Sequence, residues 1–249
     1  MNPASVLLSC VVVLNTGSGQ ITRTGDRCDT ALSPASTFKI PHALVALETG
    51  VSTKDTVEKW DGTRHPDQPL WDRDHTVLSA MRPSVLWFFQ RIAPRVGAER
   101  MHEWLQKMEY GNADTSGPIR EYWVNGRLRI SPELQVQFLR RFYAGPLPFS
   151  ARHVAAVRGA LEQQPGTQQN ARGVHKLEVP WRAGTSLNAK TGATTLASGQ
   201  SVSWLVGQLT VAEARYVFAS AVWRDRGGVD TLDGTRAAMR VFREQKLLR

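Results

Sequence analysis

The chain has 249 residues, and its 31 lysines and arginines against 22 aspartates and glutamates give a formal net charge of +9. With 41% hydrophobic and 21% charged residues, the composition excludes a mainly disordered chain and suffices for one two-lobed domain or two small ones. The basic surplus suggests nucleic acid or an anionic membrane as a partner. The chain contains no block of five or six like charges, however, and such dispersed charge favours a solvated surface.

The N-terminal apolar stretch, Ala4 to Leu14, is far shorter than the ~20 residues of a membrane span. It has neither a basic leader nor a small-residue cleavage site, so we do not interpret it as a signal peptide; the chain would then begin at the mature protein or lack its leader. We predict a hairpin of Val6 to Leu14 with Gln20 to Thr24. Cys10 and Cys28 flank it, and a disulfide and two buried thiols both fit.

The middle of the chain has helical periodicity. A helix from Ser36 to Thr49 stops at Gly50, and residues 51–83, rich in Asp, Pro, Trp and His, form a long and partly ordered connection. Further helices are predicted over Val85–Val96, Ala98–Met108, Pro132–Tyr143 and Ala151–Gln163. The polar stretch Gln163 to Gly173 is predicted to be an exposed loop.

Strand-like sequence returns towards the C-terminus, at Ser203–Leu209 and Arg215–Trp223, and a basic amphipathic helix closes the chain near Thr235–Leu248. Strands therefore lie at both ends of the chain and helices fill the middle. This order predicts an α+β fold in which one antiparallel sheet is built from both chain ends and flanked by helices. We expect one domain, with a mixed lobe of roughly residues 1–50 and 170–249 and an inserted all-helical lobe of roughly 51–169.

Several kinds of site are disfavoured by missing motifs. The six histidines show no HExxH spacing, no CxxC pair occurs, and neither GxGxxG nor a Walker loop is found. We therefore expect no metal and no nucleotide cofactor. A Ser-His-Asp triad stays open, although the GxSxG elbow that often carries its serine is missing.

Ser36-Thr37-Phe38-Lys39 has the parts of an activated nucleophile. The serine begins a helix, where free N–H groups and positive potential can hold an oxyanion, and the lysine lies one turn later on the same face. If apolar neighbours desolvate Lys39, its pKa falls and it can accept the serine proton. The alternative is an N-terminal capping serine followed by a surface lysine.

Lys190-Thr191-Gly192 strengthens the catalytic interpretation. The tripeptide precedes strand-like sequence, so its lysine, hydroxyl and glycine can line a cleft. S-x-x-K together with K-T-G is the motif pair of serine β-lactamases and penicillin-binding proteins. A plain turn is the alternative for this tripeptide taken alone.

The segment Pro34 to Pro41 closely resembles the active-site segment of class D (oxacillinase-type) β-lactamases, of the penicillin-binding protein and DD-peptidase-like superfamily. Four further segments resemble that family in the same order: Leu70 to Gln90 with its second serine, Tyr110-Gly111-Asn112, Trp123 to Gln135, and Lys190 to Gly207. Five motifs in order over about 200 residues are far more specific than any one of them.

The resemblance implies a role for each matching residue. Ser36 would form an acyl-enzyme with a β-lactam, and Lys39 would be carbamylated by CO2 (N6-carboxylysine) and act as the general base. Trp123 would hydrogen-bond that carbamate, and Ser84 would pass a proton to the lactam nitrogen. Apart from this carbamate, no cofactor is expected.

The resemblance also implies how the substrate is held. The backbone N–H groups of Ser36 and Ala193 would form the oxyanion hole, and Gly192 would let the strand come close. The substrate carboxylate would be held by Lys190, Thr191 and an arginine of the last helix, for which we choose Arg236.

Two departures from the family pattern bear on turnover. Leu86 stands where the second motif usually carries valine, and the stretch from Tyr110 to Trp123 is several residues shorter than usual. The alternative is a β-lactam sensor or penicillin-binding domain that is acylated but deacylates slowly. Sensors tend to carry a polar residue at the position of Leu86 and to be attached to membrane-spanning helices. The given sequence shows neither feature, which favours the enzyme.

The expected substrate is a small β-lactam, with neither nucleic acid nor a membrane span involved, since the aromatic residues do not alternate with basic ones in a stacking platform. The resemblance implies a periplasmic or secreted protein. The motifs leave the oligomeric state and the spectrum of β-lactams open.

Overall fold

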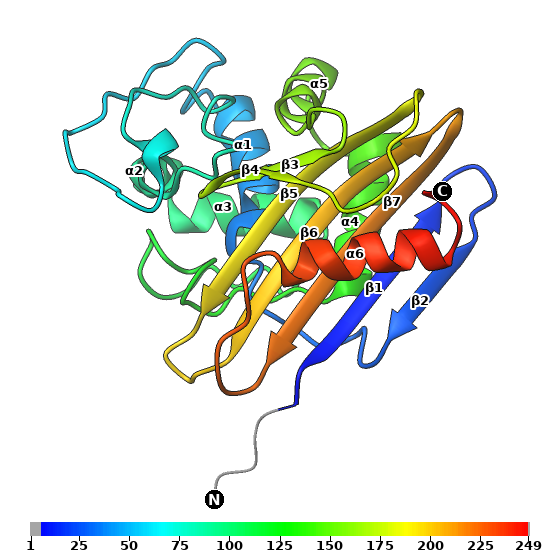
Figure 1. The fold of residues 1–249 in the computed structure, drawn as a ribbon. Helices are drawn as coiled ribbons and strands as arrows, with labels where there is room; N and C mark the ends of the chain where they lie inside the picture. Colours follow the sequence, from blue (N-terminus) through cyan, green and yellow to red (C-terminus); the bar gives the residue numbers. More distant parts are fainter. Residues whose placement is uncertain (1–5, 249) are drawn as a thin grey trace, which may run out of the picture.

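The computed structural model describes residues 6–248, and its centre is a five-stranded antiparallel sheet built from both ends of the chain (Figure 1). The strands follow the order β2-β1-β7-β6-β5. They are β1 (Leu8–Asn15), β2 (Ile21–Gly25), β5 (Thr185–Thr195), β6 (Ser201–Val211) and β7 (Ala214–Arg224). This confirms the α+β fold with a sheet assembled from both termini.

The helices occupy the two faces of the sheet and the region beside it, as Figure 1 shows. They are α1 (Lys39–Glu48), α2 (Leu86–Val96), α3 (Ala98–Lys107), α4 (Pro132–Ala144), α5 (Ala151–Ala160) and α6 (Asp233–Glu244). Two 3₁₀ helices, η1 (Ala35–Phe38) and η2 (Pro69–Trp71), lie at the start of α1 and in the long connection. Within residues 6–248, no helix is long and apolar enough to cross a membrane.

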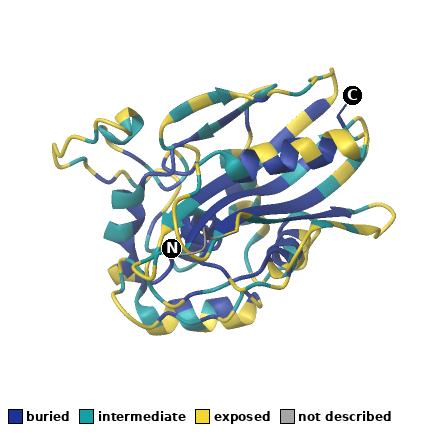
Figure 2. Ribbon diagram, turned by 60° about the horizontal axis from the view of Figure 1, so that its bottom comes forward, coloured by how far each residue is buried: buried dark blue, intermediate teal, exposed yellow. Residues whose placement is uncertain are grey.

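The sheet separates two apolar cores, because successive side chains of a strand point to opposite faces. On β1, Val12 and Leu14 pack into the core shared with α1 and α4, whereas Val11 and Val13 pack with α6. Figure 2 shows the strands buried between these layers, with α6 exposed along its outer side. The face under α1 and α4 carries most of the core and is the one beside the site described below.

The N-terminal hairpin is closed by a disulfide. Strands β1 and β2 pair in the register Cys10↔Gly25, and Cys28 follows the second strand. The Sγ atoms of Cys10 and Cys28 are bonded, with their Cα atoms 5.3 Å apart. Of the two interpretations that the sequence allows, the structure contains the disulfide.

The stretch from Gln163 to Gly173 is the main error in the predicted elements. It was expected to be an exposed loop, but it contains β3 (Thr167–Asn170), which pairs with β4 (Gly173–Lys176) in a two-stranded hairpin. The side chains buried here are polar: Gln168 and Asn170 are covered, and Gln163 accepts from the N–H of Gln169. A strand is predicted from the alternation of apolar and polar residues. Because the buried side chains of β3 are amides, this alternation is missing and the strand was not predicted.

Candidate active site

A cavity of about 210 Å³ lies between the C-terminal half of β5 and the loops around α1 and α2. We call it the Ser36 cavity. It is lined by Ser36, Gln68, Trp71, Ser84, Leu86, Val124, Asn170, Ala171, Arg172, Thr191, Gly192, Ala193 and Thr231. Six residues singled out from the sequence, which lie up to 157 positions apart, are thus brought together: Ser36, Ser84, Leu86, Thr191, Gly192 and Ala193.

Ser36 and Lys39 form the first reactive pair. Ser36 lies in η1, which runs directly into α1, so Lys39 is one turn further on and its Nζ atom is hydrogen-bonded to Ser36 Oγ at 2.8 Å. The lysine is fully buried, and this desolvation lowers its pKa from 10.5 to about 7. Roughly half of Lys39 is therefore the neutral amine at neutral pH, in contact with the hydroxyl it is expected to activate.

Ser84 and Lys190 form a second serine–lysine pair on the same cavity. Lys190 donates to Ser84 Oγ at 2.9 Å and to the carbonyl oxygen of Thr191 at 2.8 Å. Burial, followed by the charge of Lys39, lowers the pKa of Lys190 well below its ordinary value. Ser84 has φ +59°, a left-handed conformation that is costly for a residue with a side chain and tends to be kept at functional sites.

The turn that carries Ser36 is fixed from several sides. Trp204 of β6 donates its indole N–H to the carbonyl of Ser33 at 2.9 Å, and the buried Gln135 of α4 donates to Thr37 Oγ1 at 2.8 Å. Gly192 of β5 packs so close that a Cβ there would lie 3.1 Å from the backbone nitrogen of Ser36. The N–H region of Ser36 and the strand residue Ala193 thus border the same space, where an oxyanion hole is expected.

Trp123 is buried in the core, against Phe38 and His42, which lie on either side of Lys39 in the sequence. Its ring stacks on Phe38 at 5.7 Å and meets His42 edge-on at 5.4 Å, while Lys39 Nζ lies 5.4 Å from the centre of the Phe89 ring. Within the described residues, the indole N–H of Trp123 and both ring nitrogens of His42 have no hydrogen-bond partner. An unsatisfied buried N–H group is costly, so a hydrogen-bond acceptor next to this indole would be stabilised.

His42 was not singled out from the sequence. Burial and the charge of Lys39 lower its pKa to about 3, so the ring is neutral. The sequence could have indicated this histidine, because it lies three residues after Lys39 and therefore on the same side of the helix. The surrounding stretch is apolar, and a histidine there is more readily interpreted as core than as part of a site.

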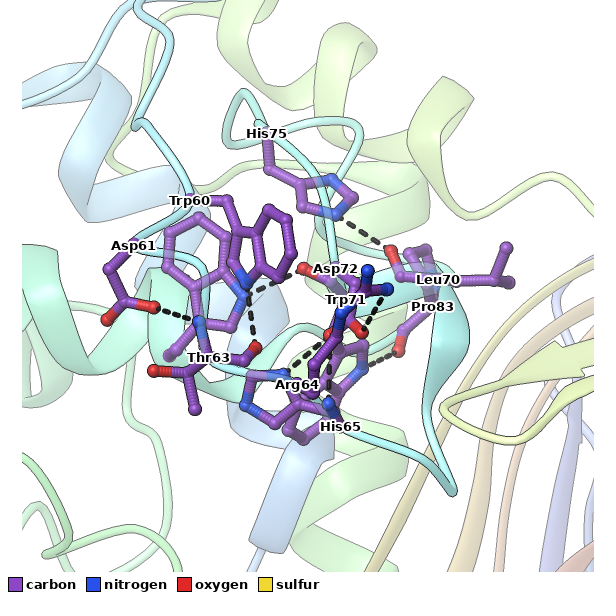
Figure 3. A network of polar contacts seen from close by, with 11 residues as sticks. Trp60, Asp61, Thr63, Arg64, His65, Leu70, Trp71, Asp72, His75 and Pro83 are labelled. Carbon is purple, nitrogen blue, oxygen red and sulfur yellow. Dashed lines mark hydrogen bonds and ion pairs between the residues drawn. The ribbon is translucent and has the colours of Figure 1, made fainter.

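The long connection of residues 51–83 forms the outer wall of the Ser36 cavity, and a polar network holds it in place (Figure 3). Trp71 donates its indole N–H to the carbonyl of Pro83 at 2.7 Å, and its own carbonyl accepts from Trp87 at 3.0 Å. Asp72 accepts from the backbone N–H of His65 at 3.0 Å, with His65 Nδ1 2.8 Å from the same oxygen. Trp71 is therefore a fixed part of the wall.

Residues 9–245 match the model of the penicillin-binding protein transpeptidase domain. The chain belongs to this family. Among curated relatives, it is 35% identical to β-lactamase OXA-48 of Klebsiella pneumoniae over 78% of this chain and 66% of the other. It is 34% identical to "Probable beta-lactamase YbxI" of Bacillus subtilis over 79% and 67%. It is 32% identical to regulatory protein BlaR1 of Bacillus licheniformis over 75% of this chain, which spans only 28% of that protein.

Solved structures show the same relationship within the transpeptidase-domain family. The BPu1 β-lactamase superposes with a TM-score of 0.80 at 28% identity, covering 96% of this chain and 92% of the other. Class D β-lactamase BAT-2 also gives 0.80 at 28% identity, covering 97% and 92%. These neighbours confirm the resemblance to class D β-lactamases that the motifs indicate.

Arg236 is the predicted site residue of this transpeptidase domain that the structure does not place with the others. It lines a different cavity, where its guanidinium lies 3.1 Å from Asp233 Oδ1 and 3.3 Å from Asp230 Oδ1. The first turn of α6 sets this direction, because Gly234 is pressed against the backbone of β6 and Thr235 is buried against Gln168 of β3. The next side chain along, that of Arg236, therefore points outwards.

Proposed function

We propose that this transpeptidase domain hydrolyses β-lactams through a covalent acyl-Ser36 intermediate. The observation that carries the proposal is the Ser36–Lys39 pair, in which a fully buried lysine with a pKa of about 7 contacts the hydroxyl at 2.8 Å. The β-lactamases among its relatives support the substrate class. Ser36 Oγ attacks the lactam carbonyl carbon while its proton moves to Lys39.

The remaining steps use the second pair. As the lactam C–N bond breaks, Ser84 gives its proton to the departing nitrogen, and the proton that Lys39 took from Ser36 replaces it on Ser84. Lys190, whose lowered pKa favours the neutral amine, contacts Ser84 Oγ at 2.9 Å and orients this hydroxyl. One proton therefore passes in total from Ser36 to the lactam nitrogen. Water then hydrolyses the Ser36 ester, which releases the ring-opened acid and regenerates the hydroxyl. The N–H groups of Ser36 and Ala193 stabilise the oxyanion at both stages.

We further propose that Lys39 is carbamylated. Carbamylation requires a neutral amine, which the pKa of about 7 supplies, and a donor for the new carboxylate, which the unpartnered indole N–H of Trp123 supplies. The carbamate would make Lys39 an anionic general base. Labelling with ¹³C-bicarbonate tests this directly: a carbamate signal in ¹³C NMR is expected, and it should be missing in Lys39→Met.

A second candidate is a sensor or penicillin-binding domain that stays acylated, and the match to BlaR1 favours it. Leu86 and Ser84 both line the Ser36 cavity, and the apolar side chain at position 86 is the feature that favours the enzyme over a sensor. The two candidates share acylation and differ only in the fate of the ester.

One experiment separates the candidates. The protein is mixed with a chromogenic cephalosporin and, separately, with a fluorescent penicillin, in buffer containing bicarbonate. Turnover that is lost in Ser36→Ala and kept in Ser198→Ala, a change on the exposed β5–β6 turn, supports the enzyme. A stable one-to-one adduct without turnover contradicts it and leaves the sensor.

We propose a periplasmic or secreted location. The Cys10–Cys28 disulfide supports it, because such bonds persist in oxidising compartments. Fractionation of cells that produce the protein tests it; activity confined to the cytoplasm, with reduced cysteines, would contradict it.

A further inference from the structure

The Ser36 cavity has one permanent charge in its wall. Among the described residues that line it, Arg172 alone carries a formal charge, and no aspartate or glutamate faces it. The two lysines beneath the cavity are fully buried and have lowered pKa values, whereas a guanidinium stays protonated in proteins. An anionic substrate therefore meets a fixed positive charge only at Arg172.

The position of Arg172 is fixed by hydrogen bonds and by strand pairing. Arg172 lies in the two-residue turn between β3 and β4, whose strands pair through Asn170 and Gly173. The buried side chain of Asn170 accepts from the N–H of Arg172 at 2.8 Å and lies 3.0 Å from His175 Nε2, so the turn is pinned at its base. Its hairpin is attached to the start of α6 through Gln168 and Thr235.

The guanidinium of Arg172 is also available. Within the described part of the chain it has no ion pair or hydrogen bond, while that of Arg236 is engaged by two aspartates outside the Ser36 cavity. Asn170, Ala171 and Arg172 lie on the rim of the cavity together with Thr191 and Thr231. A carboxylate held by Thr191 would thus have an unpaired guanidinium on the same rim.

We propose that Arg172 binds the carboxylate of the β-lactam substrate, in the role that the family resemblance assigns to Arg236. The inference rests on the proposed function and names the residue that selects for a carboxylate. An arginine can bind a carboxylate through two parallel hydrogen bonds, and such charge-assisted bonds are about twice as strong as neutral ones. The β3–β4 hairpin is then a part of the substrate site.

The test compares a penicillin with its methyl ester, which lacks only the negative charge. In Arg172→Ala, acylation of Ser36 by benzylpenicillin is expected to lose on the order of 10- to 100-fold in kcat/KM, mostly through KM. The methyl ester should change by less than about threefold, which also shows that the variant is folded. Arg172→Lys should restore part of the preference for the acid. Arg240→Ala, on the exposed side of α6, is the matched control and should leave both rates unchanged.

The outcomes are distinct. Equal losses for acid and ester in Arg172→Ala, or a selective loss in Arg236→Ala instead, would overturn the role of Arg172 while leaving the proposed function intact. Wild-type protein that forms no acyl adduct with either compound, as judged by mass spectrometry, would overturn the proposed function, and the role of Arg172 with it.

Discussion

Two of the cavities beside the sheet differ in the burial and pairing of the charged side chains around them. The Ser36 cavity measures about 210 Å³ and lies over two buried lysines, Lys39 and Lys190. Among the described residues, the polar partners of these lysines are serine hydroxyls and a backbone carbonyl. The other, here the α6 cavity, measures about 660 Å³ and is bordered by Arg236, Arg240 and Arg243. Those arginines are exposed, and Arg236 is paired with two aspartates.

The difference shows that neither size nor net charge identifies a reactive site. Removing an exposed, paired charge changes the free energy of unfolding little, because water already solvates it. Burying an amine without a counter-charge, by contrast, lowers its pKa. The smaller cavity lies over two lysines, Lys39 and Lys190, whose pKa values are lowered by burial. Four predictions test this contrast, beginning with the largest effect.

The first prediction removes the buried amine. Lys39→Met should lower the rate of β-lactam turnover by on the order of 10³-fold, because Ser36 loses the base at 2.8 Å from its hydroxyl. Steady-state hydrolysis measures it, and Lys54→Met, at an exposed position, is the matched control. A loss of less than tenfold in Lys39→Met would mean that the contrast between the cavities has no catalytic meaning.

The second prediction concerns pH. Because the pKa of Lys39 is about 7, kcat/KM measured without bicarbonate should fall as pH drops below 7, approaching tenfold per pH unit. His42 titrates near 3 and should add no limb between pH 5 and 8. A rate that stays flat from pH 8 to pH 5 would show that a neutral Lys39 amine is not required.

The third prediction is the effect of the same group on stability. Lys39 has a pKa of about 7 when folded against 10.5 when exposed, so between these values the unfolded chain binds more protons. The free energy of unfolding should therefore rise from pH 7 towards 10.5, by up to about 1.4 kcal/mol per pH unit from this residue.

Urea unfolding at several pH values measures this slope. Lys39→Met should be more stable than wild type at pH 7, and its free energy of unfolding should rise less steeply with pH. Some slope should remain, because Lys190 also has a lowered pKa. Identical slopes in the two proteins would contradict a desolvated lysine at position 39.

The smallest effect is expected in the α6 cavity. Arg243→Ala should change kcat/KM by less than twofold and the free energy of unfolding by less than about 0.5 kcal/mol, since this arginine is exposed. Parallel kinetics and urea unfolding check both numbers. A tenfold change in activity would show that the α6 cavity takes part in the reaction after all.

Most elements could be predicted from the sequence, because their apolar residues follow the period of a helix or a strand. The predicted helix Val85–Val96 is α2 (Leu86–Val96), and Arg215–Trp223 lies within β7. The β3–β4 hairpin was missed because its buried residues are amides, which carry no hydrophobic period. The Lys190-Thr191-Gly192 tripeptide was expected before a strand but lies inside β5, next to the turn that carries Ser36.

The sequence by itself predicted Ser36, Lys39, Ser84 and Lys190 as site residues, from the S-x-x-K and K-T-G motifs and from the family resemblance, and the structure joins them in two serine–lysine pairs. Only the tertiary structure decided which arginine borders the Ser36 cavity. The motif-based expectation chose Arg236, but the packing of Gly234 against β6 turns that side chain towards two aspartates, and a polar hairpin brings Arg172 to the cavity instead. The direction of a side chain depends on what packs beneath its neighbours, and those contacts come from parts of the chain far away in sequence.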